Sequence, residues 1–428
     1  MGWASPNLDR LASENSTIFL PEGTSWMAAC SGIGGIIGAI LGAIFIELIG
    51  SKSTIVLSLL FDCAQWSCLI VANSSVWIYA SRLIGGSSAA IDFSCFSLYL
   101  AEVTEPEIRG ACISIAVVGS VIGLVFGTVA ETYLYSMSSY LYLTTCLLGI
   151  LMLAWLMDSP YYLVKRNNIL KAKKAIEFYH PERNIEFELN EIKIYVEMDA
   201  DMKSKLEELK VPVIRKSLLL IIILCCLPGL SGVQSLVHYM ETILKKAHFD
   251  LIEPQNFVIC SNSLAILGSF LPVVMIDRFG RRILLIVSSI GTATSMIGLG
   301  IHFFLIDALY IENRLLQWIP ITFILLSAFA YTIGLQTIPS TVLSEIFPNK
   351  IKNIAACIST IAFASAAAIS MKTYDPMAKS LGEAYVFWIY AAMSLIAVPV
   401  ALFLMPETKG KSLQQIQMEL MKSKKIGM

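Results

Sequence analysis

The sequence predicts an all-α membrane protein built of two related helical bundles. Of its 428 residues, 56% are apolar and only 15% are charged, and the mean hydropathy is +0.70. A soluble protein is about 45–50% apolar and about 25% charged, so the excess apolar surface must face lipid. Two further observations support the prediction: eleven apolar segments are long enough to span a bilayer, and one set of charged motifs occurs twice.

A helix needs about 20 mostly apolar residues to cross a bilayer. Five segments of this kind precede the one long polar stretch, and six follow it. The segments are 25–49, 53–73, 76–101, 111–131, 138–157, 217–241, 255–276, 283–305, 317–343, 354–372 and 384–405. The predicted units are an outer N-terminal segment 1–24, an N-terminal bundle 25–157, a cytoplasmic helical loop 158–216, a C-terminal bundle 217–405 and a cytoplasmic tail 406–428.

The distribution of Lys and Arg over the loops predicts the orientation. One set of alternate loops, with the C-terminal tail, carries 24 of the 31 basic residues, and the opposite set carries five. Basic loops stay in the cytoplasm, which places the C-terminus inside and, with eleven spans, the N-terminus outside. Segment 1–24 lacks the apolar run of a signal peptide, and Asn15 begins the glycosylation sequon Asn15-Ser16-Thr17 there.

Composition and spacing exclude several classes of protein. The net charge of −1 gives no overall field that favours nucleic acid. The ten cysteines all lie in apolar stretches, where they behave as small buried hydrophobes. The sequence contains no His and Cys cluster with metal-ligand spacing, no phosphate-binding glycine loop and no nucleophile–base set. We therefore expect neither an enzyme nor a bound metal or cofactor.

The loop 158–216 is amphipathic in two pieces. Apolar residues recur at helical spacing among lysines from Ile169 to Tyr179, and again from Ile185 to Val196. This pattern predicts two short helices. A solvated linker helix is one explanation of the pattern.

Three charged motifs at the predicted cytoplasmic ends of the spans occur in both halves, in the same order. The motifs are Glu47-Leu48-Ile49-Gly50-Ser51-Lys52 and Asp277-Arg278-Phe279-Gly280-Arg281-Arg282, Glu102 with Arg109 and Glu345 with Lys352, and Asp158 and Glu407 at the ends of the halves. Two homologous bundles in parallel orientation are the plan of a major facilitator transporter. On that plan the first half has six spans, so we expect its first helix to be missing.

These charged groups are candidates for a conformational switch. Carboxylates and guanidiniums at helix ends can pair and tie the bundles together while the cavity opens outward, and separate when it opens inward. Glycine permits the tight turn between helices. The alternative is that the charges only anchor helix ends at the interface. The candidate switch residues are Glu47, Gly50, Lys52, Glu102, Arg109, Asp158, Asp277, Arg278, Gly280, Arg281, Arg282, Glu345, Lys352 and Glu407.

The chain resembles the sugar porter family of the major facilitator superfamily, in particular the insect facilitated trehalose and hexose transporters. Trp3-Ala4-Ser5-Pro6 looks like the outer end of the family's first helix. Tyr99-Leu100-Ala101-Glu102 with Arg109-Gly110 matches the fourth-helix signature, and Pro406-Glu407-Thr408-Lys409-Gly410 matches the family's C-terminal motif. The resemblance implies a multi-pass carrier of the plasma membrane that needs no ATP, with the helical loop bracing its closed inner gate.

The resemblance also implies a cargo site, and here the sequence departs from the family's pattern. The family's Gln-Gln-x-Ser-Gly-x-Asn in the seventh helix is Pro228 to Gln234 in this chain, so both Gln positions are lost. Pro228-Gly229 still predicts a broken helix in mid-membrane, where transporter sites are found. The residues implied to contact substrate are Ser231, Gln234, Tyr239, Thr332 and Ser340.

We therefore expect transport of a sugar, trehalose or a hexose-like molecule, by alternating-access facilitated diffusion. The lost amides weaken the match to a sugar, because each unmatched buried hydroxyl costs about 1–3 kcal/mol. Two alternatives stay open. One is a diverged relative that senses a solute or no longer transports, and the other is a carrier of a small polar solute that is not a sugar.

Three ionisable residues interrupt the spans of the first half. Asp62 and Asp92 lie near mid-span, where a charge costs at least about 2.5 kcal/mol. Each is expected either to hydrogen-bond a polar neighbour or to couple transport to protons. Arg82 lies six residues into its span, and we expect it to snorkel to the outer interface or to line an outer vestibule.

Overall fold

The structure is a computed structural model that describes residues 3, 5–7, 24–104, 106–198, 209–249, 251–309, 314–347 and 349–407. The predicted glycosylation site Asn15 lies outside the described residues, as do the side chains of Arg109 and Asp277.

Within the described ranges the fold consists of helices and the turns between them, and it contains no strand. The first half contains α2 (Thr24–Ile49), α3 (Ser51–Ile70), α4 (Ser75–Val103), α5 (Pro106–Tyr133) and α6 (Tyr135–Trp155). The connecting stretch forms α7 (Pro160–Lys165), α8 (Ile169–Tyr179) and α9 (Ile185–Met198). The second half contains α11 (Pro212–Leu230), α12 (Val233–Lys246), α13 (Pro254–Phe279), α14 (Arg281–Asp307), the 3₁₀ turn η1 (Arg314–Gln317), α15 (Trp318–Ile333), α16 (Ile338–Ile346), α17 (Asn349–Leu381), α18 (Glu383–Leu395), α19 (Ala397–Pro399) and the π-helical turn η2 (Val400–Leu404).

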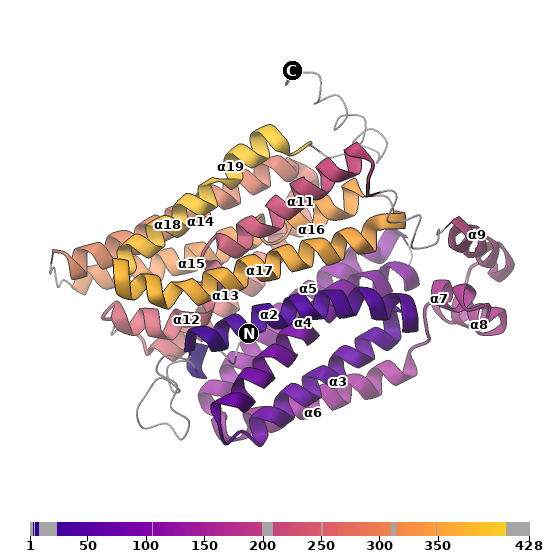
Figure 1. The fold of residues 1–428 in the computed structure, drawn as a ribbon, viewed down its shortest axis with the longest axis horizontal. Helices are drawn as coiled ribbons and strands as arrows, with labels where there is room; N and C mark the ends of the chain where they lie inside the picture. Colours follow the sequence, from indigo (N-terminus) through magenta and orange to yellow (C-terminus); the bar gives the residue numbers. More distant parts are fainter. Residues whose placement is uncertain are drawn as a thin grey trace.

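The two halves lie side by side as two bundles, with α7 to α9 beyond one end of them (Figure 1). We call this end of the molecule the loop end and the opposite end the far end. In the described residues, nine helical segments are long and apolar enough to cross a membrane. The other two predicted spans correspond to α5 and α13, which are helices of 28 and 26 residues.

Small residues let the bundles approach each other. α2 packs against α17, and α5 packs against α13. A Cβ built on Gly32 would lie 2.5 Å from the Ala368 Cβ, and one on Gly35 would lie 3.1 Å from the Ala364 Cβ. Because glycine has no side chain, α2 reaches α17 at a distance that a larger residue would prevent.

The helices α7 to α9 form a small cluster of their own. Ala172, Ala175 and Ile176 of α8 are fully buried against Leu163 of α7 and Leu189 of α9. The apolar spacing that predicted two helices therefore corresponds to the buried faces of α8 and α9. The limits of the predicted units along the chain stay a prediction.

Candidate functional site

The centre of the second half contains an interrupted helix. α11 ends at Leu230, and α12 begins at Val233 after Gly232, whose φ of 80° lies in the left-handed region. Pro228 has no N–H to donate within the helix, and the Ser231 hydroxyl bonds the Pro228 carbonyl at 2.8 Å. A Cβ on Gly232 would meet the Tyr390 ring at 2.2 Å. The break therefore depends on glycine for both its conformation and its packing.

Hydrogen bonds hold α12 against the helices next to it. The Ser235 and Ser370 hydroxyls are 2.9 Å apart, which joins α12 to α17. The Tyr390 hydroxyl of α18 donates to Ser235 at 3.3 Å. The Tyr239 ring packs against the Tyr374 ring of α17 in a tilted arrangement, with ring centroids 4.8 Å apart. These contacts fix the position of the segment that follows the break.

The five predicted cargo residues differ in what their polar groups do. The Thr332 hydroxyl bonds the Phe329 carbonyl at 2.9 Å, and the Ser340 hydroxyl bonds the Thr337 carbonyl at 2.8 Å. The Tyr239 hydroxyl donates to the Met371 carbonyl at 3.3 Å. Together with the Ser231 bond, all four hydroxyl groups among the five candidates therefore donate to backbone carbonyls. Their role in binding cargo stays a prediction.

Gln234 differs from the other four because its amide reaches another side chain. Gln234 Nε2 donates to the Tyr331 hydroxyl at 3.3 Å, which joins α12 to α15. Tyr331 is buried and precedes Thr332. Tyr331 was not predicted from the sequence, because the family's motifs mark only positions with a known substrate contact. The signal that could have identified it is a tyrosine directly before the candidate residue Thr332.

At the loop end of the second half, four charged residues form a junction between α14, α16 and the chain that follows η2. Arg281 donates to Glu345 Oε1 through Nε at 3.1 Å and through Nη2 at 2.7 Å. The backbone N–H groups of Arg281 and Arg282 donate to the two carboxylate oxygens of Glu407, each at 3.2 Å. Arg282 Nε donates to the Met405 carbonyl at 2.5 Å. The chain after the last helix is thereby tied to the start of α14.

The loop end of the first half has the corresponding junction between α2, α3 and α4. The Ser51 hydroxyl donates to Glu102 at 2.7 Å. Lys52 Nζ donates to the Leu156 carbonyl at 2.7 Å and lies 3.9 Å from Asp158. Glu47 forms an ion pair with Lys165 of α7. The described contacts of the second junction stay within the second half, and those of the first junction also reach α7 of the connecting stretch. The sequence predicted pairs that tie the two halves together, and that role stays a prediction.

Two further switch candidates, Arg278 and Lys352, occupy the loop end of α13 and the first turn of α17. The Arg278 guanidinium lies 5.8 Å from the centroid of the Phe279 ring. Arg278 and Lys352 each make at least one further interaction. The switch role of all fourteen candidates stays a prediction.

The ionisable residues within the spans of the first half differ in how their polar groups are bonded. Ser58 of α3 donates to Asp92 of α4, which is the polar neighbour that the sequence predicted. The expectation that Arg82 snorkels to the interface is wrong: Arg82 is 8% exposed, and its guanidinium stacks 4.1 Å above the Trp3 ring. Glu131, which is fully buried, accepts from Asn7 Nδ2 at 2.9 Å. The described N-terminal residues cover this part of the bundle and keep Arg82 inside.

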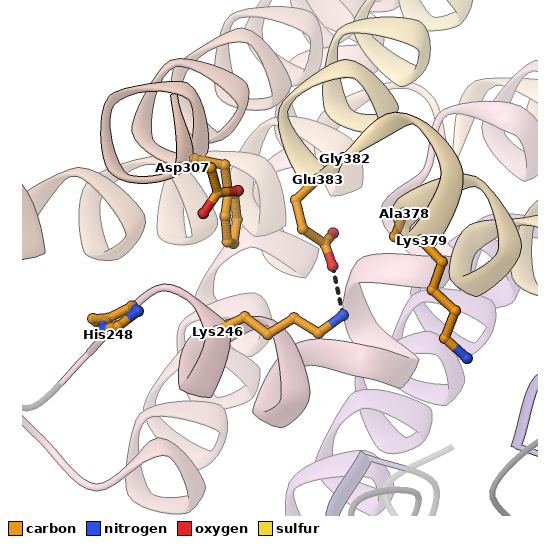
Figure 2. Close-up of a pocket in the computed structure, with 8 residues that line it drawn as sticks. Lys246, His248, Asp307, Ala378, Lys379, Gly382 and Glu383 are labelled. Atoms are coloured by element: carbon orange, nitrogen blue, oxygen red, sulfur yellow. Dashed lines mark hydrogen bonds and ion pairs between the residues drawn. The ribbon is translucent and has the colours of Figure 1, made fainter. Parts of the chain in front are cut away.

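A pocket of about 400 Å³ opens at the far end of the second half (Figure 2). Figure 2 shows Glu383 facing Lys246 across it, with their atoms Oε1 and Nζ 2.7 Å apart. The second Glu383 oxygen accepts from the Tyr374 hydroxyl at 2.6 Å. The residues that line the pocket are Lys246, His248, Phe303, Asp307, Ala378, Lys379, Gly382 and Glu383. It contains none of the five predicted cargo residues.

The comparison with protein families identifies the chain. The model of the family described as "Sugar (and other) transporter" matches residues 11–420. The chain belongs to this family. As a member of the sugar transporter family it is not expected to be an enzyme, and the predicted resemblance is confirmed.

Curated relatives include the facilitated trehalose transporter Tret1 of Drosophila mojavensis, which is 27% identical over 427 residues, or 98% of this chain and 49% of that protein. Tret1 of Culex quinquefasciatus is 25% identical over 430 residues, or 98% of this chain and 82% of that protein. This sugar transporter family member thus spans about half the length of the Drosophila relatives it matches.

Solved structures share the fold. The E. coli xylose transporter XylE in an inward open conformation superposes with a TM-score of 0.78 at 20% identity, covering 98% of this chain and 96% of XylE. A partially occluded inward open form gives 0.79 at 19% identity, with 96% of each chain covered. The predicted all-α membrane fold of the major facilitator type is therefore confirmed.

Proposed function

We propose that this chain carries a sugar, trehalose or a hexose-like molecule, across the membrane by alternating-access facilitated diffusion. Membership of the sugar transporter family and the similarity to relatives named trehalose transporters support the proposal. The observation that carries it is the break between α11 and α12 at Gly232. A discontinuous helix in mid-membrane leaves backbone and side-chain polar groups available to a solute. The activity of the whole protein is part of this proposal.

In the proposed cycle, α12 is the element that closes over the cargo. Its first turn presents Gln234, whose amide meets Tyr331 across the bundle. Sugar hydroxyls both donate and accept, so they can replace this amide–phenol hydrogen bond without leaving either partner unsatisfied. Gly232 supplies the backbone freedom for α12 to move relative to α11. Gln234 and Tyr331 are the pair that we assign to the cargo.

We propose that the protein lies in the plasma membrane and that its loop end faces the cytoplasm. The orientation follows from the 24 of 31 basic residues that belong to this side of the sequence. In this orientation the far end is the outer face. Two described hydrogen bonds join α5 and α13 toward this end: the Tyr133 hydroxyl donates to Asn256 at 2.7 Å, and Asn262 Nδ2 donates to the Thr128 hydroxyl at 3.1 Å. Such bonds hold the bundles together at the outer face, as an inward-facing conformation requires.

A second candidate cargo is a small polar solute that is not a sugar. The observation that favours it is the engagement of Ser231, Thr332 and Ser340 with backbone carbonyls. A sugar needs many convergent polar groups, whereas a smaller solute needs fewer. The fold, the interrupted helix at Gly232 and the proposed conformational switch would be the same for this cargo. The two proposals differ only in the solute that is carried.

Uptake of labelled trehalose and glucose into cells that express the chain tests the proposal. We expect uptake above that of Gly232→Val, because a β-branched residue strains the left-handed backbone and clashes with Tyr390. Gly119→Ala on α5 is the matched control, since a Cβ there meets nothing within 4 Å. Tyr331→Phe should raise KM with surface expression unchanged. If neither sugar enters above the Gly232→Val level with protein at the surface, the sugar assignment is wrong.

A further inference from the structure

A lysine of one bundle is bound by two residues of the other at the far end. Lys372 lies on α17, nine residues or about 14 Å before the helix ends at Leu381. Its Nζ donates to the Ser25 hydroxyl at 2.9 Å and lies 4.0 Å from the centroid of the Trp26 ring. Ser25 and Trp26 both belong to the first turn of α2. Among the described residues no carboxylate pairs with Lys372.

The geometry of this contact indicates which conformation it stabilises. An ammonium inside a span is costly unless a polar group or an aromatic face compensates for lost water. Both compensating groups of Lys372 come from α2, so the charge is satisfied only while α2 and α17 stay together at the far end. Parting the bundles there removes the hydroxyl and the ring at once.

A second cation near the far end, Arg82, is compensated only in part: its guanidinium lies 4.1 Å from the centroid of the Trp3 ring, but two of its donors are unsatisfied. Arg82 is buried, and within the described part of the chain its atoms Nε and Nη2 have no hydrogen-bond partner. Its neighbours are Glu131 of its own bundle and His238 of the other bundle. A buried charged donor without a partner destabilises the state that buries it. Water that enters when the bundles part at the far end would satisfy these two donors.

We propose that Lys372, Trp26 and Ser25 form the latch of the far gate, and that Arg82 opposes the latch. The latch stabilises the conformation closed at the far end, and the two unsatisfied donors of Arg82 destabilise it. The two contributions oppose each other and so reduce the free-energy difference between the two conformations, both of which a carrier must populate in order to cycle. This inference rests on the proposed alternating-access function.

The test measures the distance between the bundles at the far end in the purified chain in lipid nanodiscs. Fluorophores are attached through noncanonical amino acids at Met137 of α6 and Leu315 of η1, which are 67% and 73% exposed. Single-molecule energy transfer then gives the fraction of molecules open at the far end, with no sugar present. We expect Lys372→Met to raise this fraction roughly threefold or more, as the loss of one cation–π contact predicts. Arg82→Met should lower it.

Two matched variants isolate the latch. Lys379→Met lies on the same helix, but Lys379 pairs with Asp375 within α17 at 2.8 Å, so it should leave the open fraction unchanged. Trp26→Leu removes the ring and keeps the lysine, and should raise the open fraction as Lys372→Met does. If Arg82→Met does not accumulate, the open fraction is measured in Arg82→Gln, which also removes the charge.

Unchanged open fractions in both Lys372→Met and Trp26→Leu overturn the latch. A rise in the open fraction for the Arg82 variants overturns the opposing role. Because the measurement needs no cargo, the latch and the proposed transport fail separately. Shifted distances without uptake of either sugar support the latch and remove the sugar assignment, and uptake with unshifted distances does the reverse.

Discussion

The loop-end junctions of the two halves share a backbone conformation and differ in charge. Gly50 and Gly280 precede α3 and α14 with φ of 84° and 87°, and both have ψ of 163°. Lys52 and Arg282, at equivalent positions, each donate to a carbonyl at the end of their half. One position earlier the halves diverge. Ser51 makes one hydrogen bond from a neutral donor, whereas Arg281 donates through two N–H groups to a single oxygen of Glu345.

This difference shows which part of the motif the fold requires. The glycine conformation is kept in both halves, while the charged donor is exchanged for a hydroxyl in one of them. The first half compensates with α7, since Lys165 pairs with Glu47 and the Tyr162 ring packs over Gly50. The backbone junction is therefore the constant element, and its electrostatic support can come from different residues.

The largest effect is expected from replacing the two glycines. Their φ and ψ lie in a region that only glycine adopts readily, so Gly280→Ala should cost about 1–3 kcal/mol of stability. Gly50→Ala should cost more, because its Cβ would lie 2.6 Å from the Tyr162 ring, whereas at Gly280 it meets only the Glu407 carboxylate at 3.0 Å. Thermal denaturation in detergent, followed by size-exclusion chromatography, measures both.

Gly123→Ala is the control for this pair, since a Cβ at that helical position meets nothing within 4 Å. It should leave the denaturation temperature unchanged or raise it slightly, as alanine favours the helix. Equal losses of stability in Gly50→Ala and Gly280→Ala would show that the ring of Tyr162 moves aside. If neither variant loses stability, the two junctions do not depend on the glycine conformation.

The second effect concerns the charge difference itself. A double-mutant cycle of Arg281→Ala and Glu345→Ala should give a coupling of about 1.5–3 kcal/mol, typical of hydrogen bonds to charged groups. Arg281→Ala alone should also slow transport with protein retained at the membrane. The cycle of Ser51→Ala with Glu102→Gln should give a smaller coupling, because its donor is neutral. A larger coupling in the first half would reverse the ranking of the junctions.

The backbone positions of these junctions could be predicted from the sequence, whereas the contacts around the candidate cargo residues could not. Positions such as Gly50 and Gly280 are set by local geometry, and a repeat that places them in register identifies them. The contact between Gln234 and Tyr331 depends on how α12 and α15 cross, which a motif does not specify. The burial of Arg82 depends on Trp3, a residue 79 positions away in the chain. Long-range packing of this kind has no signature in spacing.

The smallest effect tests the support that α7 lends to the first half. The ion pair of Lys165 with Glu47 is partly exposed, with side chains 42% and 23% accessible. Exposed pairs contribute about 0.2–1 kcal/mol, so Lys165→Met should lower the denaturation temperature by a small amount. Salt should reduce the difference from the unmodified chain. If Lys165→Met costs as much as Gly280→Ala, α7 supports the first half more than its exposed contacts predict.

Lys173→Met is the control, because Lys173 pairs with Glu186 inside the helical loop and does not touch α2. The hydrogen bond from Lys173 lowers the pKa of Glu186. A lowered folded-state pKa gives a stability contribution that is present above the ordinary Glu pKa of about 4.3 and is lost as pH falls through the folded-state value. Lys173→Met should therefore differ from the unmodified chain at pH 7 and match it at strongly acidic pH, without changing the opening of the loop end. A loss of denaturation temperature at pH 7 in Lys173→Met equal to that in Lys165→Met would mean that the contact of Lys165 with α2 stabilises the first half no more than an ion pair within the helical loop does.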